Sequence, residues 1–284
     1  MATNRIHEVL KRASLFLEQH DKEPIVAELL LQHHLQIDRS QMFMKLREEI
    51  ESDILQSFNK DLKLHAEESV PIQHIIGYEY FYGRKFIVNE HVLIPRQETE
   101  EVVLKSFEIM ADKQPQTIVD VGTGSGIIGI TIALEKPGHD IYATDISSEA
   151  LRIARENASR LGAKLTFYEG DFLDPLQQEQ ITVDLIVSNP PYIPYAEAKN
   201  LSDIVRNHDP ERALFAKENG LYAYRKILEQ AKHVLRRGGQ IVFEIGFDQG
   251  ESVPNLATTY FPNALIDVFS DINGNNRIVT ITTL

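Results

Sequence analysis

Residues 117–129 read TIVDVGTGSGIIG, a β-branched run that passes into a glycine-rich turn and then into the apolar start of a helix. Glycine lets the backbone approach a ligand closely at a helix N-terminus. Gly124, Gly126 and Gly129 have the G-x-G-x-x-G spacing of dinucleotide-binding turns, and Asp145 lies about 20 residues beyond them. A tight turn without a ligand is the alternative for such a motif alone. Together these features predict the first strand, turn and helix of an α/β sheet that binds a nucleotide-like ligand.

The chain after residue 94 alternates between β-rich and helical segments, which is typical of a doubly wound sheet. The last two β-rich segments are too close in sequence for a crossover helix, so we expect them to pair antiparallel. The predicted strands are 117–121, 140–144, 165–168, 183–187, 240–245, 264–269 and 277–281, and the predicted helices include 98–110 and 221–235.

The chain before residue 73 carries apolar residues at helical spacing and almost no glycine, which predicts a small helical bundle. Residues 73–93 hold alternating aromatic side chains around Gly83 and predict a β-hairpin. We therefore divide the chain into a bundle at 1–72, a hairpin linker at 73–93 and a sheet domain at 94–284. The bundle could recognise a substrate or simply pack.

The tetrapeptide Asn189-Pro190-Pro191-Tyr192 follows a buried apolar run, at the strand end where such sheets bind ligands. The Asn189 side chain and the Pro190 backbone each offer a carbonyl oxygen, Pro191 stiffens the turn, and Tyr192 offers a flat face for stacking. Two acceptors can hold both hydrogens of a planar NH2 group and aim its nitrogen at an electrophile. A tight turn with a capping asparagine is the alternative. We predict Asn189, Pro190 and Tyr192 as catalytic and all four residues as substrate-binding.

Acidic residues near the glycine-rich turn indicate which electrophile is bound. Asp120 precedes the first glycine, where a carboxylate would attract the amino group of a methionine moiety and repel a pyrophosphate. This favours S-adenosylmethionine over a nicotinamide dinucleotide. Asp171 and Phe172 could place an acceptor and an aromatic face around adenine, although a solvated turn explains Asp171 alone. Because Asp145 and Asn189 follow two further strands, we expect all of these side chains to converge on one crevice.

The composition limits the possible partners. The chain has 42 Asp and Glu against 29 Lys and Arg, a formal net charge of −13, so we expect no direct nucleic acid binding. The absence of cysteine excludes disulfides and thiolate nucleophiles, and the histidines lack ligand spacing, so we expect no metal. No apolar run approaches the ~18 residues of a membrane span, and residues 1–12 lack the apolar region of a secretion signal. We expect a cytoplasmic protein without membrane contact.

The segment 195–215 is charged and has little periodicity, which predicts a long loop. We expect this loop to cover the active site and to become ordered when a partner docks. His208 within it fits a solvent-facing residue better than a general base. Arg96 and Glu98 could touch cofactor or substrate, but an ion pair at a helix start explains them equally well.

Several short motifs are spread over nearly the whole chain. They are GYEYFYGRKF at 77–86, LIPRQETE at 93–100, DVGTGSG at 120–126, NPPYIP at 189–194, P-x-x-A-L at 210–214, G-L-x-x-Y-R at 220–225 and D-x-x-G-x-x-R at 271–277. Together they resemble the motifs of peptide chain release factor N(5)-glutamine methyltransferases of the PrmC/HemK type. Gln97 stands where that family usually has a second proline, and Phe172 replaces a tryptophan common in some members.

The resemblance implies a Rossmann-like methyltransferase that uses S-adenosyl-L-methionine, leaves S-adenosyl-L-homocysteine, and methylates the glutamine of the Gly-Gly-Gln loop of bacterial class I release factors. It implies that Asp145 holds the ribose hydroxyls, that Phe172 lies near the adenine, and that residues 189–192 bind the glutamine. With the acids argued above, the predicted cofactor-binding residues are Asp120, Gly122, Thr123, Gly124, Ser125, Gly126, Asp145, Asp171, Phe172 and Asn189.

Two other classes fit some of the same residues. A DNA adenine methyltransferase would share the grip at 189–192, since the adenine amine resembles an amide nitrogen, but it must flip its base and needs a basic surface. A dinucleotide oxidoreductase or a non-catalytic binding module would leave residues 189–192 without a role. We take the protein glutamine methyltransferase as the prediction and the DNA enzyme as the alternative.

Overall fold

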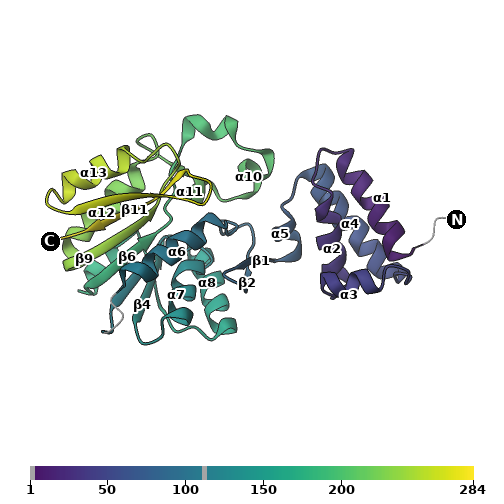
Figure 1. Ribbon diagram of the computed structural model, residues 1–284, viewed down its shortest axis with the longest axis horizontal. Coiled ribbons are helices and arrows are strands. Elements are labelled where there is room, and N and C mark those ends of the chain that lie inside the picture. Colours follow the sequence, from purple (N-terminus) through teal and green to yellow (C-terminus); the bar gives the residue numbers. More distant parts are fainter. Residues whose placement is uncertain (1–3, 111–113) are drawn as a thin grey trace. The chain divides into compact units, whose positions relative to one another are not determined.

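The computed structural model describes residues 4–110 and 114–284. It divides into two compact units, which we describe separately (Figure 1). The bundle unit comprises residues up to 77 together with 202–208, and the sheet unit comprises residues 78–201 and 209–284. No helix within the described ranges is long and apolar enough to cross a membrane.

The sheet unit is built on one seven-stranded sheet. Its strands are β3 Thr117–Val121, β4 Asp140–Asp145, β5 Thr166–Glu169, β6 Val183–Ser188, β9 Leu235–Glu244, β10 Leu265–Ser270 and β11 Asn276–Thr282. Their order is β10-β11-β9-β6-β3-β4-β5, in which β11 pairs antiparallel with both β9 and β10 and the remaining pairs are parallel. The predicted doubly wound sheet with an antiparallel last strand is confirmed.

Helices cover both faces of this sheet, as Figure 1 shows. Ile118 of β3 packs in the core formed with α6, α7 and α8, and its neighbour Val119 packs in the opposite core with α9, α12 and α13. Because successive strand residues point to opposite faces, a strand buried on both sides reads as a continuous apolar run. The bounds are α6 Glu98–Ile109, α7 Ile127–Glu135, α8 Ser148–Leu161, α9 Asp174–Gln178, α12 Tyr222–Val234 and α13 Ser252–Tyr260.

The bundle unit is helical, as its apolar periodicity predicts. Leu17, Leu30 and Phe58, from three different helices, are fully buried in its core. A face of this kind, repeated every three to four residues, stabilises a helix mainly by tertiary packing. The helices are α1 Ile6–Glu18, α2 Ile25–Leu35, α3 Arg39–Met44, α4 Ser52–Glu68 and α5 Ile72–Ile76.

The predicted hairpin is present at the start of the sheet unit. Its strands are β1 Tyr78–Phe81 and β2 Arg84–Ile87, joined through Tyr82 and Gly83, which both have positive φ. Two positive φ values are what a two-residue hairpin turn of type I′ requires, so glycine is favoured there. The hairpin is confirmed within the predicted linker 73–93, whereas residues 73–76 at the start of that linker belong to helix α5.

The prediction of an irregular loop at 195–215 was wrong, because short regular elements occupy it. Tyr195 stacks on Phe215 with ring centroids 5.3 Å apart, which brings the two ends of the segment together. Short polar elements carry little apolar periodicity, so the sequence pattern does not show them. The elements are β7 Ile193–Pro194, the 3₁₀-helix η1 Tyr195–Asn200, α10 Asp203–His208, α11 Glu211–Leu214 and β8 Phe215–Ala216.

Candidate active site

A pocket opens in the sheet unit and gathers most of the predicted cofactor-binding residues with Pro191. Of the other predicted residues, Asp120, Gly126, Pro190 and Tyr192 are not part of its lining. The predicted residues that line it are Gly122, Thr123, Gly124, Ser125, Asp145, Asp171, Phe172 and Asn189. The carboxyl ends of β3, β4 and β6 therefore contribute to one site, as the strand pattern predicts.

The glycine-rich turn between β3 and α7 needs glycine for steric reasons. Gly126 has φ +87°, and a Cβ there would lie 2.7 Å from Cδ1 of Ile130 and 3.2 Å from Cβ of Ala154. Any side chain would thus collide with the helix that the turn starts. The N–H groups of Gly122, Thr123 and Gly126 donate to backbone carbonyls, so the glycines serve to keep side chains out of the pocket that the turn lines.

Asp145 at the end of β4 links the glycine-rich turn to the start of α8 by hydrogen bonds. Its Oδ2 accepts a hydrogen bond from the Gly124 N–H at 2.9 Å, and its Oδ1 accepts one from the Ser147 N–H at 2.9 Å. Burial raises the pKa of Asp145, and these hydrogen bonds and the nearby Arg212 oppose that effect. Asp145 therefore supports the glycine-rich turn as well as lining the pocket.

Asp120 lies beneath the turn. Its Oδ2 accepts hydrogen bonds from Thr123 Oγ1 at 2.5 Å and from the Gly129 N–H at 2.9 Å. Its Oδ1 is buried and has no hydrogen-bond partner among the residues that the structure describes. Burial raises the pKa of Asp120 to about 6. An acceptor oxygen left over at this point fits a cationic ligand group, so the residues present suit S-adenosylmethionine.

Phe172 holds an uncommon backbone conformation at the pocket wall, with φ +51°. A non-glycine residue in the left-handed region costs about 1 kcal/mol or more, and such strain concentrates at binding sites. Its neighbour Asp171 also lines the pocket, and desolvation raises the pKa of that carboxyl. The pair places an aromatic side chain and an acceptor at the pocket, and their role in binding adenine stays a prediction.

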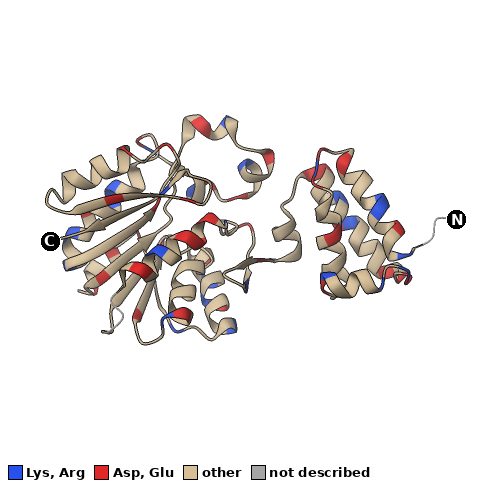
Figure 2. Cartoon of the chain, in the orientation of Figure 1, with Lys and Arg blue, Asp and Glu red and all other residues tan. Residues whose placement is uncertain are grey.

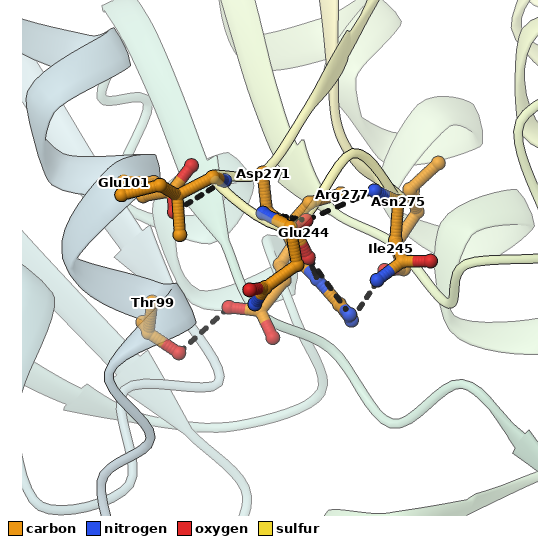
Figure 3. A network of polar contacts seen from close by, with 9 residues as sticks. Thr99, Glu101, Glu244, Ile245, Asp271, Asn275 and Arg277 are labelled. Atoms are coloured by element: carbon orange, nitrogen blue, oxygen red, sulfur yellow. Dashed lines mark hydrogen bonds and ion pairs between the residues drawn. The ribbon is translucent and has the colours of Figure 1, made fainter.

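Asn189 directly follows β6, and a chain of hydrogen bonds through Thr99 and Glu244 supports its carboxamide. Its Nδ2 donates to Thr99 Oγ1 at 3.2 Å, and the Thr99 hydroxyl donates to Glu244 Oε2 at 2.7 Å. Thr99 lies in the first turn of α6 and Glu244 at the end of β9, so three elements meet at this chain of hydrogen bonds. Figure 3 shows Thr99 and Glu244 pointing toward one another.

Arg277 of β11 holds the backbone next to Glu244 by hydrogen bonds. The guanidinium donates to Asp271 Oδ2 at 3.3 Å and to the Ile245 carbonyl at 3.2 Å, and the Ile245 N–H donates to the Arg277 carbonyl at 2.8 Å (Figure 3). Burial raises the pKa of Glu244 to about 7, while the Thr99 hydrogen bond and the positive charge of Arg277 oppose this shift. The Asp271 and Arg277 motif thus holds the end of β9 in place.

The Tyr192 backbone is clamped from the opposite side. Its carbonyl accepts a hydrogen bond from Gln249 Nε2 at 3.3 Å, and Gln249 Oε1 accepts one from the Gly246 N–H at 3.0 Å. Gly220 lies so close that a Cβ there would be 2.1 Å from the Tyr192 oxygen. Burial raises the pKa of Tyr192 to about 12, so its phenol stays neutral at physiological pH.

Arg96 and His208 have other partners than expected. Arg96 lines the pocket and forms an ion pair with the buried Asp209 at 2.9 Å, so the partner in its ion pair is Asp209 and not a residue at the helix start, and a contact with cofactor or substrate stays a prediction. His208 Nε2 lies 3.3 Å from the Glu68 carbonyl, within the bundle unit. Among residues 4–110 and 114–284, no cluster of three or more His, Asp or Glu could hold a metal ion.

Sequence reasoning did not single out the residues that support Asn189 and Tyr192. Thr99 lies within the motif at 93–100, but a threonine in that motif does not by itself indicate its partners. Glu244 stands inside the apolar run 240–245, and an acid in a buried strand was a signal for a paired or functional carboxylate. Gln249 gave no signal, because its partners are distant in sequence.

We expect Glu244→Gln to stabilise the protein at high pH. A buried carboxyl whose pKa rises from 4.5 to about 7 on folding contributes its full stability below pH 4.5 and loses it as the pH rises through 7. Urea unfolding at pH 5, 6.5 and 8 measures the free energy of unfolding of both proteins. That of the variant should exceed that of wild type by on the order of 3 kcal/mol at pH 8, and the difference should shrink toward pH 5. The exposed Glu156→Gln is the control. A gap that does not change with pH would contradict this assignment.

Two sequence families match the chain. Residues 101–208 match the Methyltransferase small domain family, and residues 8–77 match the PrmC N-terminal domain family. The two matches fall largely in the sheet unit and the bundle unit respectively.

Curated relatives align with almost the entire chain. A release factor glutamine methyltransferase of Bacillus cereus is 44% identical over 97% of this chain and 98% of its own length. One of Bacillus subtilis is 44% identical over 96% of both. Among solved structures, a methyltransferase from Pyrococcus furiosus superposes with a TM-score of 0.52 at 15% identity, covering 71% of this chain and 90% of its own, which supports the fold.

Proposed function

This chain belongs to the release factor glutamine methyltransferase family, and we propose on this basis how its pocket carries out methyl transfer. The enzyme uses S-adenosylmethionine and methylates the side-chain amide nitrogen of the glutamine in the Gly-Gly-Gln motif of class I peptide chain release factors. One observation carries the mechanism: Asn189 lines the pocket, and its side-chain Nδ2 donates a hydrogen bond to Thr99.

The substrate amide is held by the tetrapeptide after β6. Asn189 Oδ1 and the Pro190 carbonyl accept hydrogen bonds from the two N–H groups of the substrate amide. The Tyr192 ring packs against the plane of that amide. Held in this way, the nitrogen loses conjugation with its carbonyl and directs its lone pair into the pocket. Tyr192 stays neutral and does not act as a base, so the proton leaves to water.

The turn after β3 and the ends of β4 and β5 hold the cofactor. S-Adenosylmethionine supplies, when bound, an electrophilic methyl group on a positively charged sulfur. We assign the amino group of its methionine moiety to Asp120 Oδ1, the ribose hydroxyls to Asp145 and the adenine to Phe172 and Asp171. The unused Asp120 oxygen and the strained Phe172 support these assignments.

The bundle at 1–72 is assigned to recognition of the release factor. We infer that the protein acts in the cytoplasm, where translation terminates, and that it does not bind nucleic acid directly. The net charge of −13 supports the second inference, as does the mixture of Lys and Arg with Asp and Glu along the helices in Figure 2.

The decisive experiment gives the purified protein methyl-labelled S-adenosylmethionine with a class I release factor, the same factor with its Gly-Gly-Gln glutamine changed to alanine, or duplex DNA. Label should appear on the first alone. Label on DNA, or on the altered factor, would reject the proposal. A thermal shift assay adds a separate test of the cofactor, since S-adenosylmethionine should raise the melting temperature and NAD should not.

A further inference from the structure

The carboxamide of Asn189 can adopt two orientations that differ only in whether the oxygen or the NH2 group faces the pocket. The two orientations have opposite consequences, because only the oxygen can accept a hydrogen from the substrate nitrogen. The site must therefore contain something that selects one of them. The groups behind Asn189 are buried, with Thr99 at 1% and Glu244 at 2% exposure.

The hydrogen-bond chain behind Asn189 provides this selection. An ionised carboxylate can only accept, so the single hydroxyl proton of Thr99 is directed to Glu244 at 2.7 Å. Thr99 Oγ1 then has only lone pairs left for Asn189, and it accepts from Nδ2 at 3.2 Å. The amide oxygen must consequently lie on the opposite side of the carboxamide.

The groups around Glu244 act in both directions on the ionised state that this selection needs. Burial, the largest effect, and Glu98 of α6 disfavour the ionised carboxylate, while the hydrogen bonds from Thr99 and Asn189 and the charge of Arg277 of β11 favour it. Glu244 also interacts electrostatically with the phenols of Tyr192 and Tyr224. Assays at pH 8.5 keep Glu244 mostly ionised, because its pKa is about 7.

We propose that Thr99 and Glu244 are positioning residues that turn the Asn189 carboxamide so that its oxygen faces the acceptor nitrogen. The inference rests on the proposed function and adds two residues to it, Thr99, which lines the pocket next to Asn189, and the buried Glu244; the proposed mechanism assigns neither of them a contact with substrate or cofactor. Protonation of Glu244, or removal of the Thr99 hydroxyl, would leave both orientations of Asn189 accessible. The fraction of enzyme ready to react would then fall.

The test compares Thr99→Val, which keeps the shape and removes the hydroxyl, with Thr99→Ser, which keeps the hydroxyl. At pH 8.5 the valine variant should lose about 10- to 50-fold in kcat, in line with loss of one hydrogen bond to a charged network. The Kd for S-adenosylmethionine should stay within about 3-fold, and the serine variant should stay within about 3-fold of wild type in kcat. Unchanged kcat in Thr99→Val, or equal losses in both variants, would overturn the inference.

Two further measurements separate positioning from a merely structural role. In an Asn189→Ala background, Thr99→Val should cause no additional loss, whereas independent roles would multiply the two losses. Hydrogen exchange of the Asn189 side-chain NH2, followed by NMR without substrate, should be slow in wild type and Thr99→Ser and fast in Thr99→Val. Equal exchange rates in all three proteins would refute the positioning role. This readout does not depend on turnover, whereas failure of the wild-type protein to methylate release factor would reject only the proposed function.

Discussion

We expect Asn189→Ala to lower kcat for release factor methylation by about 10²- to 10³-fold, the range found when one preorganised polar contact to a reacting group is removed. The contact strengthens as the amide nitrogen becomes tetrahedral, so its loss acts on the transition state more than on the bound substrate. The Kd for S-adenosylmethionine should change by no more than about 3-fold. Single-turnover kinetics and calorimetric titration of the cofactor measure the two quantities separately.

A matched control for this variant is Asn200→Ala in the exposed η1 segment, where the Asn200 side chain donates a hydrogen bond to Glu197 at 2.5 Å. It should keep wild-type kcat. If Asn189→Ala weakens cofactor binding as much as it lowers turnover, Asn189 belongs mainly to the cofactor pocket and the proposed grip on the amide is wrong.

Gly220→Ala should have the second large effect, because the new Cβ would lie 2.1 Å from the Tyr192 carbonyl oxygen and 2.8 Å from Gln249 Nε2. Backbone atoms cannot move away as a flexible side chain can, so the tetrapeptide itself must shift. Displacement of a substrate-holding group by about 1 Å costs about 10²-fold in rate. We also expect about 2–4 kcal/mol of lost stability from overpacking and from the φ of +86°.

The matched control is Gly138→Ala, since Gly138 has a similarly positive φ of +98° but no atom within 4 Å of the added Cβ. This variant carries the backbone strain alone, about 1 kcal/mol, and should keep its kcat. Urea unfolding and kcat measured on both variants separate strain from collision. Similar kcat values for the two variants would mean that the Gly220 and Tyr192 contact does not position the substrate site.

Local sequence patterns predicted the sheet and the pocket walls because those features depend on nearby residues. The β-branched run at 117–121, the glycine spacing after it and Asp145 each report on their own strand or turn. A parallel sheet brings its strand ends together by construction, so the convergence of Asp145, Asp171 and Asn189 could be predicted without knowing any contact.

The support of the site could not be predicted in the same way, since it depends on pairs far apart in the chain. Thr99 meets Asn189 and Glu244, Gly220 meets Tyr192, and no periodicity links such positions. Asp120 shows a different limit, because its partners Thr123 and Gly129 are near in sequence, yet the sequence indicated only a ligand contact and not the hydrogen bonds that one of its oxygens accepts.

The antiparallel strand β11 has a consequence for the order in which the newly made chain becomes an enzyme. It lies between β9 and β10, so β9 keeps an open edge until residues 276–282 have emerged from the ribosome. The same insertion delivers Arg277 to the carbonyl of Ile245, next to Glu244. A polypeptide that ends before residue 276 therefore lacks the charge of Arg277 that favours an ionised Glu244, so the support for Asn189 is complete only after β11 has been synthesised.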